Sequence, residues 1–138
     1  MKRNILLGIS ALIAVGVGLV WMTAPNGHDH NTRSASDATI KVPELSDIAK
    51  QGEVLFKANC AVCHGKNATG TQNGPPLVHK IYEPSHHSDL SFQRAAKQGV
   101  RAHHWPFGNM PPVPSVTETD VERIVAYVRE LQRANGIR

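Results

Sequence analysis

Cysteine is scarce in this chain, since Cys60 and Cys63 are the only two among 138 residues. A closed zinc site usually takes four ligands from two separated pairs, so the remaining ligands would have to come from scattered histidines. A thioredoxin-like dithiol follows a strand in an alternating strand–helix pattern, and the chain has no such pattern. A disulfide between these residues would close a small, strained loop of little stabilising value. The usual structural and redox roles of a cysteine pair are therefore disfavoured.

Other patterns are missing as well. Aromatic residues make up 5% of the chain and do not alternate with basic ones, so no nucleic acid partner is expected. There is no internal repeat, which predicts a single functional unit. No residue pattern resembles a catalytic base, a nucleophile or a substrate pocket. We therefore expect neither an enzyme acting alone nor a small-molecule substrate.

The segment Cys60-Ala61-Val62-Cys63-His64 carries the main chemical signal. C-x-x-C-H is the attachment sequence for a c-type haem. Two sulfurs three residues apart lie on one face of a helical turn, so both can bond the vinyl groups of one porphyrin. The adjacent His64 then becomes an iron ligand. Because no second C-x-x-C-H is present, the sequence predicts one covalent haem c, with thioether links through Cys60 and Cys63.

Residues 5–22 carry no charged side chain and follow the basic start Lys2-Arg3. As a helix they would span about 27 Å, close to the roughly 30 Å hydrocarbon core of a bilayer. A cleaved signal peptide usually has a shorter apolar region and a different exit, whereas Trp21 suits a membrane interface. Residues 1–24 are therefore predicted to be an uncleaved transmembrane signal anchor, with a removed signal peptide as the alternative. The positive-inside rule places the rest in the bacterial periplasm, either anchored to the inner membrane or, after cleavage, secreted.

Residues 25–42 are polar and are expected to form a flexible periplasmic linker. His28 and His30 lie in it and could bind a metal weakly, but a solvated linker accounts for them equally well. Residues 43–138 are enough for one small domain. A chain of this length is only marginally able to bury a core alone, and a haem would supply a large apolar centre.

The apolar periodicity predicts an all-α domain. Residues 46–59 and 88–98 are expected to form helices, the second ending at Gly99, a favourable residue for a helix C-terminus. Thr117 is a suitable N-cap for a third helix with acidic residues in its first turn. Apolar residues then recur at spacings of 3, 1, 3 and 3, which is the stripe of an amphipathic helix: Val121, Ile124, Val125, Val128 and Leu131.

An iron bound by His64 has an opposite face, for which Met110 is the best candidate ligand. Met1 and Met22 lie in the export segment, and the prolines that flank Met110 stiffen its loop. A His/Met pair is the ligation of electron-transfer cytochromes c and raises the reduction potential. A packing role for Met110 is the alternative.

These segments, in this order, resemble the class I cytochromes c over residues 46–134. Gly52 and Phe56 are similar to the N-terminal helix positions that pack against the C-terminal helix, where Tyr127 takes the aromatic place. The resemblance implies a small fold in which the N- and C-terminal helices cross while shorter helices and loops wrap one haem.

Two loops of the resemblance concern the haem itself. Gly74-Pro75-Pro76-Leu77 resembles a segment whose proline carbonyl, here that of Pro75, accepts the proton on the second nitrogen of His64. Leu77 is then expected to pack on the porphyrin on the His64 side. Asn109-Met110-Pro111-Pro112 resembles the distal-ligand loop and implies His64/Met110 ligation.

Histidine is unusually frequent between the two expected ligands: His79, His86, His87, His103 and His104. One of them could replace Met110, or several could form a separate copper or zinc site. Loop residues near the haem edge, some meeting propionates, are the simpler explanation. Trp105 could donate its indole N–H to a propionate or could simply pack.

Residues 43–138 have 11 basic and 9 acidic side chains, a net charge of +2. Basic residues dominate the stretch expected to enclose the haem: Lys57, Lys66, Lys80, Arg94, Lys97 and Arg101, against Glu83 and Asp89. Such a surface would steer encounter with an acidic redox partner in a salt-dependent way, or would merely be solvated.

The sequence favours a single-electron carrier between a respiratory donor and a terminal oxidase or reductase. A tightly bound electron-transfer subunit of a periplasmic dehydrogenase or oxidoreductase is an alternative. Further alternatives are a gas- or peroxide-reactive or sensing haem protein and a histidine-based metal chaperone.

Overall fold

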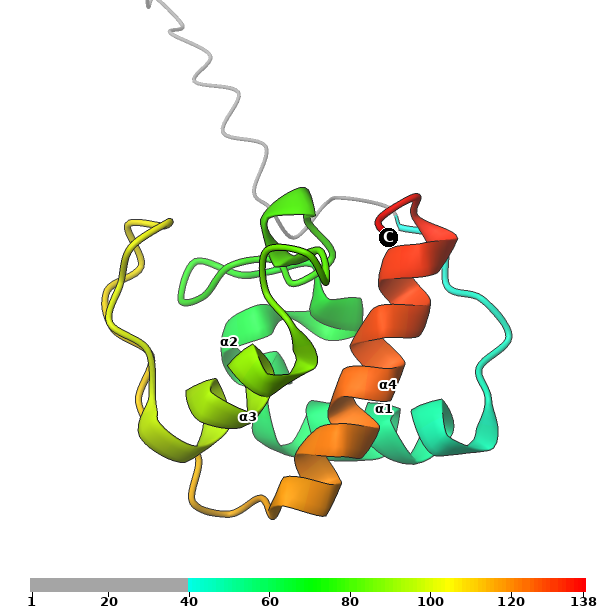
Figure 1. Cartoon of the computed structure of the whole chain (residues 1–138), viewed down its shortest axis with the longest axis horizontal. Coiled ribbons are helices and arrows are strands. Elements are labelled where there is room, and N and C mark those ends of the chain that lie inside the picture. The colour runs from blue at the N-terminus through cyan, green and yellow to red at the C-terminus, as the bar shows by residue number, and fades with distance from the viewer. Residues whose placement is uncertain (1–39) are drawn as a thin grey trace, which may run out of the picture. The chain divides into compact units, whose positions relative to one another are not determined.

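The computed structural model describes residues 40–138, which form a helical domain with one isolated β-bridge and no strand. This agrees with the predicted all-α class. Figure 1 shows its helices in order: α1 (Asp47–Asn59), α2 (Ala61–His64), the 3-10 helices η2 (Lys66–Ala68) and η3 (Lys80–Tyr82), α3 (Asp89–Gln98) and α4 (Glu118–Ala134).

The expected anchor, residues 1–24, and the expected linker up to residue 39 lie outside the described residues. Among residues 40–138, no helix has both the length and the apolar character needed to cross a bilayer. The anchor and the linker therefore stay predictions.

Helix α1 begins where its local signals place it. Ser46 is extended, and its hydroxyl accepts the backbone N–H of Ala49 at 3.3 Å, which satisfies one of the free donors of the first turn. Asp47 lies in the first turn and Lys57 in the last, so both side-chain charges complement the helix dipole.

Helix α4 begins with a reciprocal capping box. The hydroxyl of Thr117 accepts the N–H of Asp120 at 3.2 Å, and the Asp120 carboxylate accepts the N–H of Thr117 at 3.0 Å. All five residues of the predicted apolar stripe are buried: Val121, Ile124, Val125, Val128 and Leu131. The start and the inner face of this helix are as the sequence predicted.

The two longest helices of residues 40–138, α1 and α4, cross one another (Figure 1), and Gly52 lies at their contact. A Cβ atom on Gly52 would lie 1.9 Å from the Arg123 carbonyl oxygen, so only glycine permits this approach. Next to it, the rings of Phe56 and Tyr127 are fully buried, with centroids 5.5 Å apart. The helix crossing implied by the family resemblance is present.

Not every apolar residue of the predicted helices faces the core. Ile48 and Val54 in α1 and Leu90 in α3 are more than half exposed, and α3 has no fully buried residue. Val54 lies about 200° around the helix from Gly52 and so faces away from α4. Ile48 lies in the first turn of α1, one turn before Gly52, and is half exposed there.

The beginning of the described chain is fastened to the end of α4. The Asn135 side chain accepts the N–H of Lys41 at 2.9 Å and donates to the Lys41 carbonyl at 2.8 Å. The Ser46 hydroxyl donates to Glu130 at 2.6 Å. The two ends of the domain therefore lie side by side, which can be followed in Figure 1.

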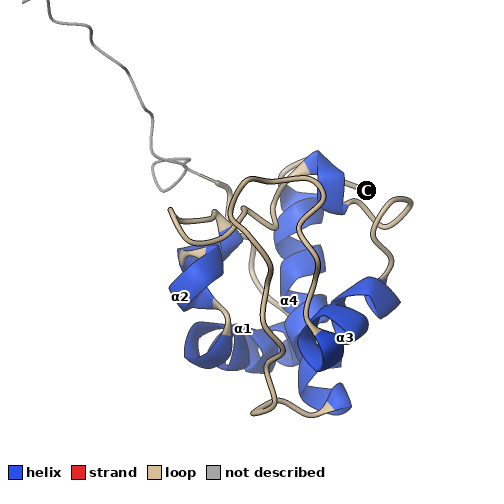
Figure 2. Ribbon diagram, turned by 90° about the vertical axis from the view of Figure 1, so that its left-hand side faces the viewer, coloured by secondary structure: helices blue, strands red, loops and turns tan. Residues whose placement is uncertain are grey.

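A long loop connects α3 to α4. It begins at Gly99, whose φ of 76° is in the left-handed region, so the predicted helix end is confirmed. Val100 and Met110 then exchange two backbone hydrogen bonds of 2.9 and 3.0 Å, which close the segment between them into a loop. Figure 2 views this loop in front of the helices.

A buried polar network joins α4 to the segment before α3. Arg129 is 6% exposed and donates to the carbonyl oxygens of Tyr82 and His87, to the Asp89 carboxylate and to the Gln132 side-chain oxygen. Gln132 in turn donates to the carbonyl oxygens of Leu77 and Tyr82. Helix α4 thus holds the backbone of residues 77–89 through two polar side chains that the sequence did not single out.

Candidate cofactor site

One cavity of about 560 Å³ opens among α3, the long loop, the start of α4 and the segments around His64. This volume is in the range typical of small-molecule and cofactor sites. Six of the seven site residues predicted from the sequence line it: Cys60, His64, Pro75, Leu77, Trp105 and Met110. Cys63 is not among the lining residues.

The two cysteines lie in a tight helical turn. Helix α1 ends at Asn59, and the carbonyl of Cys60 accepts the N–H groups of Cys63 and His64 at 3.1 and 2.9 Å. Both thiols are free and half-buried. Burial, together with the nearby Cys63, raises the pKa of Cys60 to about 11, so its thiol is protonated at neutral pH. Local chain geometry thus places two unpaired sulfurs beside the buried imidazole.

His64 is held in one orientation. Its ring is 8% exposed, and its Nδ1 lies 2.9 Å from the Pro75 carbonyl oxygen. Because a carbonyl only accepts, Nδ1 carries the proton and Nε2 keeps its lone pair. Burial lowers the pKa of His64, although the bond to Pro75 opposes this, so the neutral ring is favoured. A neutral imidazole that donates its second N–H to a carbonyl is the usual form of a metal-ligating histidine.

The Pro75 carbonyl is positioned by its neighbours. A Cβ on Gly74 would lie 2.8 Å from the Cys63 carbonyl oxygen, so this position accepts only glycine without a shift of the backbone. The Thr71 hydroxyl donates to the same Cys63 oxygen at 2.6 Å. Residues 71–75 therefore pack directly on the cysteine turn, and the contact between His64 and Pro75 is the one that the family resemblance implied.

Met110 is placed by its backbone. The bridge to Val100 fixes its N–H and carbonyl, and a Cβ on Gly99 would lie 2.5 Å from its carbonyl oxygen. Shortly beyond the two prolines, the N–H of Val113 donates to the Ala96 carbonyl at 2.8 Å, which ties the loop back to α3. The half-buried Met110 side chain is thereby held at the wall of the cavity that His64 also lines.

Trp105 contributes a buried donor. Its indole N–H has no hydrogen-bond partner among the described residues, although buried polar groups are normally paired. A polar neighbour of this indole is Tyr82. Burial raises the pKa of Tyr82, and the proximity of the Trp105 side chain offsets only part of this rise. The Tyr82 hydroxyl forms no hydrogen bond with the indole N–H. An acceptor brought in by a cofactor, such as a carboxylate, would satisfy this N–H. The residues present therefore suit a large, mainly apolar group that carries anionic substituents and a metal.

The structure separates the five histidines into two sets. His79 accepts the N–H of Ile81 at 3.2 Å as the cap of η3, and its ring packs edge-on against Trp105. The other four gather at the mouth of the cavity: His86, His87, His103 and His104.

Within the second set, partial desolvation and the neighbouring imidazoles, those of His103, His87 and His86, lower the pKa of His104. A copper or zinc site among these histidines was one alternative from the sequence, but the sequence alone does not indicate which of them come together, because residues 86–87 and 103–104 lie in different loops.

Comparison with known proteins relates this chain to one protein family. The family model described as Cytochrome c matches residues 49–132. Cytochrome c-550 of Bacillus subtilis is 35% identical over 77 residues, which cover 56% of this chain and 63% of the relative.

Two relatives have names that refer to cbb3-type cytochrome c oxidases. Subunit CcoP of Rubrivivax gelatinosus is 33% identical over 101 residues, covering 72% of this chain and 30% of the relative. Subunit FixP of Sinorhizobium medicae is 28% identical over 141 residues, which cover 93% of this chain and 46% of the relative. The chain thus spans less than two thirds of the length of each of these relatives. No solved structure matches the chain significantly.

Proposed function

Because this chain belongs to the cytochrome c family, we propose that it is a membrane-anchored carrier of single electrons with one haem in the cavity described above. Members of the family hold haem c covalently and transfer electrons, so the haem and the general activity follow from membership. The proposal adds the residues that hold the haem, the compartment and the partners. When bound, the haem supplies a one-electron iron couple.

Four residues are proposed to hold the haem. Cys60 and Cys63 form the thioether links, and His64 and Met110 bind the two faces of the iron. The observation that carries this assignment is the His64 ring itself, whose Nδ1 is occupied by the Pro75 carbonyl at 2.9 Å while Nε2 stays free at a cavity that Cys60 and Met110 also line. If His64 and Met110 both bound the iron, they would leave no position on it for a substrate, which would favour electron transfer over substrate chemistry.

Two further residues are proposed to complete the site. Leu77 is 8% exposed and lines the cavity, where it is expected to contact the porphyrin on the His64 side. The unpaired N–H of Trp105 is expected to donate to a propionate. A hydrogen bond to a charged group contributes about 1.5–3 kcal/mol, so this pairing would stabilise the loaded form.

Fewer basic side chains are free to attract a partner than the six that the sequence suggested. Lys57 pairs with Glu53 at 2.8 Å and Lys97 with Glu118 at 3.2 Å, so part of their charge is neutralised locally. Arg94 and Arg101 are exposed, line the cavity and form no ion pair with a described acid. We propose that these two arginines guide an acidic partner to the haem edge.

A terminal oxidase is the proposed electron acceptor, because relatives of this chain are named as oxidase subunits. The apolar run at residues 5–22 supports anchoring in the inner membrane, with the haem domain in the periplasm. The same relatives favour a second candidate function, in which the chain is a stably bound electron-transfer subunit. Co-purification of a stoichiometric larger subunit after mild solubilisation would select this second candidate.

The decisive experiment is the visible spectrum of the exported protein, ferric and ferrous, with and without carbon monoxide. We expect a low-spin c-type spectrum that carbon monoxide leaves unchanged in the wild type and alters in Met110→Ala. Val113→Ala is the control, because Val113 lines the same cavity but cannot bind iron. A wild type that binds carbon monoxide would contradict the carrier assignment. A Met110→Ala protein that behaves like the wild type would instead assign a histidine as the second ligand.

A further inference from the structure

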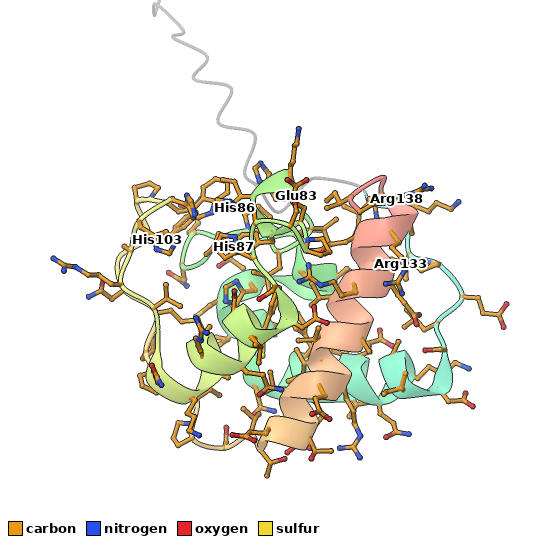
Figure 3. All side chains as sticks on the ribbon, in the orientation of Figure 1. Glu83, His86, His87, His103, Arg133 and Arg138 are labelled. Carbon is orange, nitrogen blue, oxygen red and sulfur yellow. The ribbon has the colours of Figure 1, made fainter. Side chains whose placement is uncertain are left out.

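Three imidazoles from two loops meet at the mouth of the cavity. His86 and His87 come from the segment between η3 and α3, and His104 comes from the loop that Val100 and Met110 close. One ring nitrogen of each lies within 4.8 Å of the corresponding nitrogens of the other two. Figure 3 shows the side chains of His86 and His87 in the same region as His103, which adjoins His104.

One of the pairs, His86 and His104, already has the spacing of two ligands on one metal ion. The Nε2 atoms of His86 and His104 are 3.3 Å apart. Two imidazole nitrogens bound tetrahedrally at 2.0–2.1 Å from zinc lie about 3.3–3.4 Å from each other. A metal ion can therefore replace the hydrogen bond between these rings with almost no change in their separation.

The third imidazole, that of His87, is oriented by a hydrogen bond to the backbone. Nδ1 of His87 donates to the Ile81 carbonyl at 2.6 Å, which leaves Nε2 as the nitrogen that can bind a metal. A backbone carbonyl on the second ring nitrogen is the usual support of a metal-bound histidine. The His87 carbonyl in turn accepts Nη2 of Arg129 at 2.5 Å, so the buried guanidinium fixes the backbone of this residue.

Both loops are also closed by hydrogen bonds of their own. The N–H groups of His86 and His87 donate to the Glu83 carbonyl at 3.0 and 2.8 Å. The Asn109 side chain accepts the N–H of Ala102 at 2.9 Å, which narrows the base of the loop that carries His104. Little backbone ordering is thus left for an ion to impose, and the exposed rings of His86 and His104 are free to turn the short distance that remains.

We propose that His86, His87 and His104 bind one divalent transition metal ion, with a fourth position open to solvent. Neutral imidazole ligands suit zinc and copper, whereas calcium and magnesium require oxygen ligands. The bound ion would join the segment before α3 to the loop that carries Trp105 and Met110. This metal site is separate from the proposed electron transfer, because the argument for it uses only the geometry of the two loops.

The test is a calorimetric zinc titration of the full-length, haem-loaded protein. We expect one ion per chain at this site. His86→Gln and His104→Gln should each weaken zinc binding by at least about tenfold, since even the loss of an outer-shell partner of a metal ligand typically costs 10–100-fold. Both positions are exposed, so the variants are expected to fold, and an unchanged haem spectrum would verify this.

Two controls remove imidazoles elsewhere. His103→Gln changes the ring next to His104, whose Nδ1 is already engaged with the Arg101 carbonyl at 2.8 Å and which lies outside the three-histidine group. His28→Gln/His30→Gln removes the histidines of the expected linker. Both proteins should retain the zinc affinity of the wild type, and X-ray absorption at the zinc edge should give nitrogen ligands at about 2.0–2.1 Å.

Three results would overturn the proposal. The first is the absence of a zinc site. The second is an affinity that falls in a control protein but not in the His86 and His104 variants. The third is a haem spectrum that changes in His86→Gln or His104→Gln while the far-ultraviolet circular dichroism stays that of the wild type, because it would show that the residue binds the haem iron in a folded protein.

Discussion

Arg129 is the residue whose role is least visible in the sequence. It lies on α4 among the apolar positions that face the core, and its guanidinium reaches the carbonyls of Tyr82 and His87 as well as the Gln132 side chain. Asp89, its ionic partner, is 69% exposed, so the ion pair itself contributes little. The stabilising contribution comes from the acceptors that only this side chain satisfies.

We expect Arg129→Met to lower the free energy of unfolding by about 2–4 kcal/mol. The buried Gln132 side-chain oxygen and the partly buried His87 carbonyl lose their donor, and a buried acceptor left unpaired costs about 1–3 kcal/mol. The Tyr82 carbonyl keeps its bond from Gln132. Denaturant unfolding followed by circular dichroism measures the change.

Arg133→Met is the matched control, because Arg133 lies on the same helix, is exposed and has only a 4.0 Å contact with Glu130. Its effect should stay within about 0.5 kcal/mol. Equal effects of the two substitutions would show that the buried network contributes no more than a surface charge.

At the scale of the elements, the crossing of α1 and α4 gives the sharpest expectation. Gly52→Ala would place a methyl group 1.9 Å from the Arg123 carbonyl oxygen. Alanine improves helix propensity by about 1 kcal/mol, but overpacking typically costs about 1–3 kcal/mol and more against a fixed backbone. We therefore expect a clear net loss of stability, measured by the denaturant midpoint.

Gln51→Ala is the control for this substitution, since Gln51 is the exposed neighbour in the same helix. It should be neutral or slightly stabilising. A Gly52→Ala protein as stable as Gln51→Ala would mean that the helices can separate at no cost.

The capping box of α4 predicts a pH dependence. Hydrogen bonds from the side chain and the backbone of Thr117 lower the pKa of Asp120 below its ordinary value of 3.8. A depressed pKa in the folded state contributes stability above the unfolded-state value, and this contribution is lost as the pH falls through the folded-state value. The stability difference between wild type and Asp120→Asn should thus be present at pH 6 and should shrink below about pH 4. Thermal unfolding at both pH values tests this, and a difference that grows in acid would contradict it.

Helix ends could be predicted well because their signals are local. Ser46, Gly99 and Thr117 act within three or four residues of themselves, and each lies at the expected end. Exposure could not be predicted as well, because it depends on the partner helix. The outward position of Val54 follows from the approach of α4 at Gly52 on the opposite face of α1, which no pattern within α1 alone reveals.

At the scale of the whole molecule, the cavity also combines features that the sequence predicts with others that depend on contacts between distant segments. C-x-x-C-H and the loops around Pro75 and Met110 could be placed together through the family resemblance, and the structure brings them to one cavity. Cys63 remains outside its lining. A metal site among the five histidines was one alternative from the sequence, but its three members could not be identified there, because they come from loops that are separate in the sequence.

The positive charges of Arg94 and Arg101 at the cavity are expected to influence the rate of electron exchange with a partner. Arg101→Gln, alone or with Arg94→Gln, should slow second-order electron exchange with an acidic oxidase partner at low salt and should flatten its dependence on ionic strength. Stopped-flow kinetics between about 10 mM and 500 mM salt covers the range in which surface charges become screened.

Lys50→Gln is the charge-matched control, because Lys50 does not line the cavity and pairs with Asp47. A control that slows exchange as much as Arg101→Gln would show that net charge matters and position does not.

The contacts of Asn135 with Lys41 and of Glu130 with Ser46 bring the two ends of the domain to one corner, beside the outer end of the α1–α4 pair. None of the residues at this corner lines the cavity, so a second polypeptide joined at either end is expected to leave away from it. We therefore expect that the domain can be appended to or inserted into a larger protein without a change in its interior. The relatives of this chain that are about two or three times the length of the matched region are compatible with such reuse.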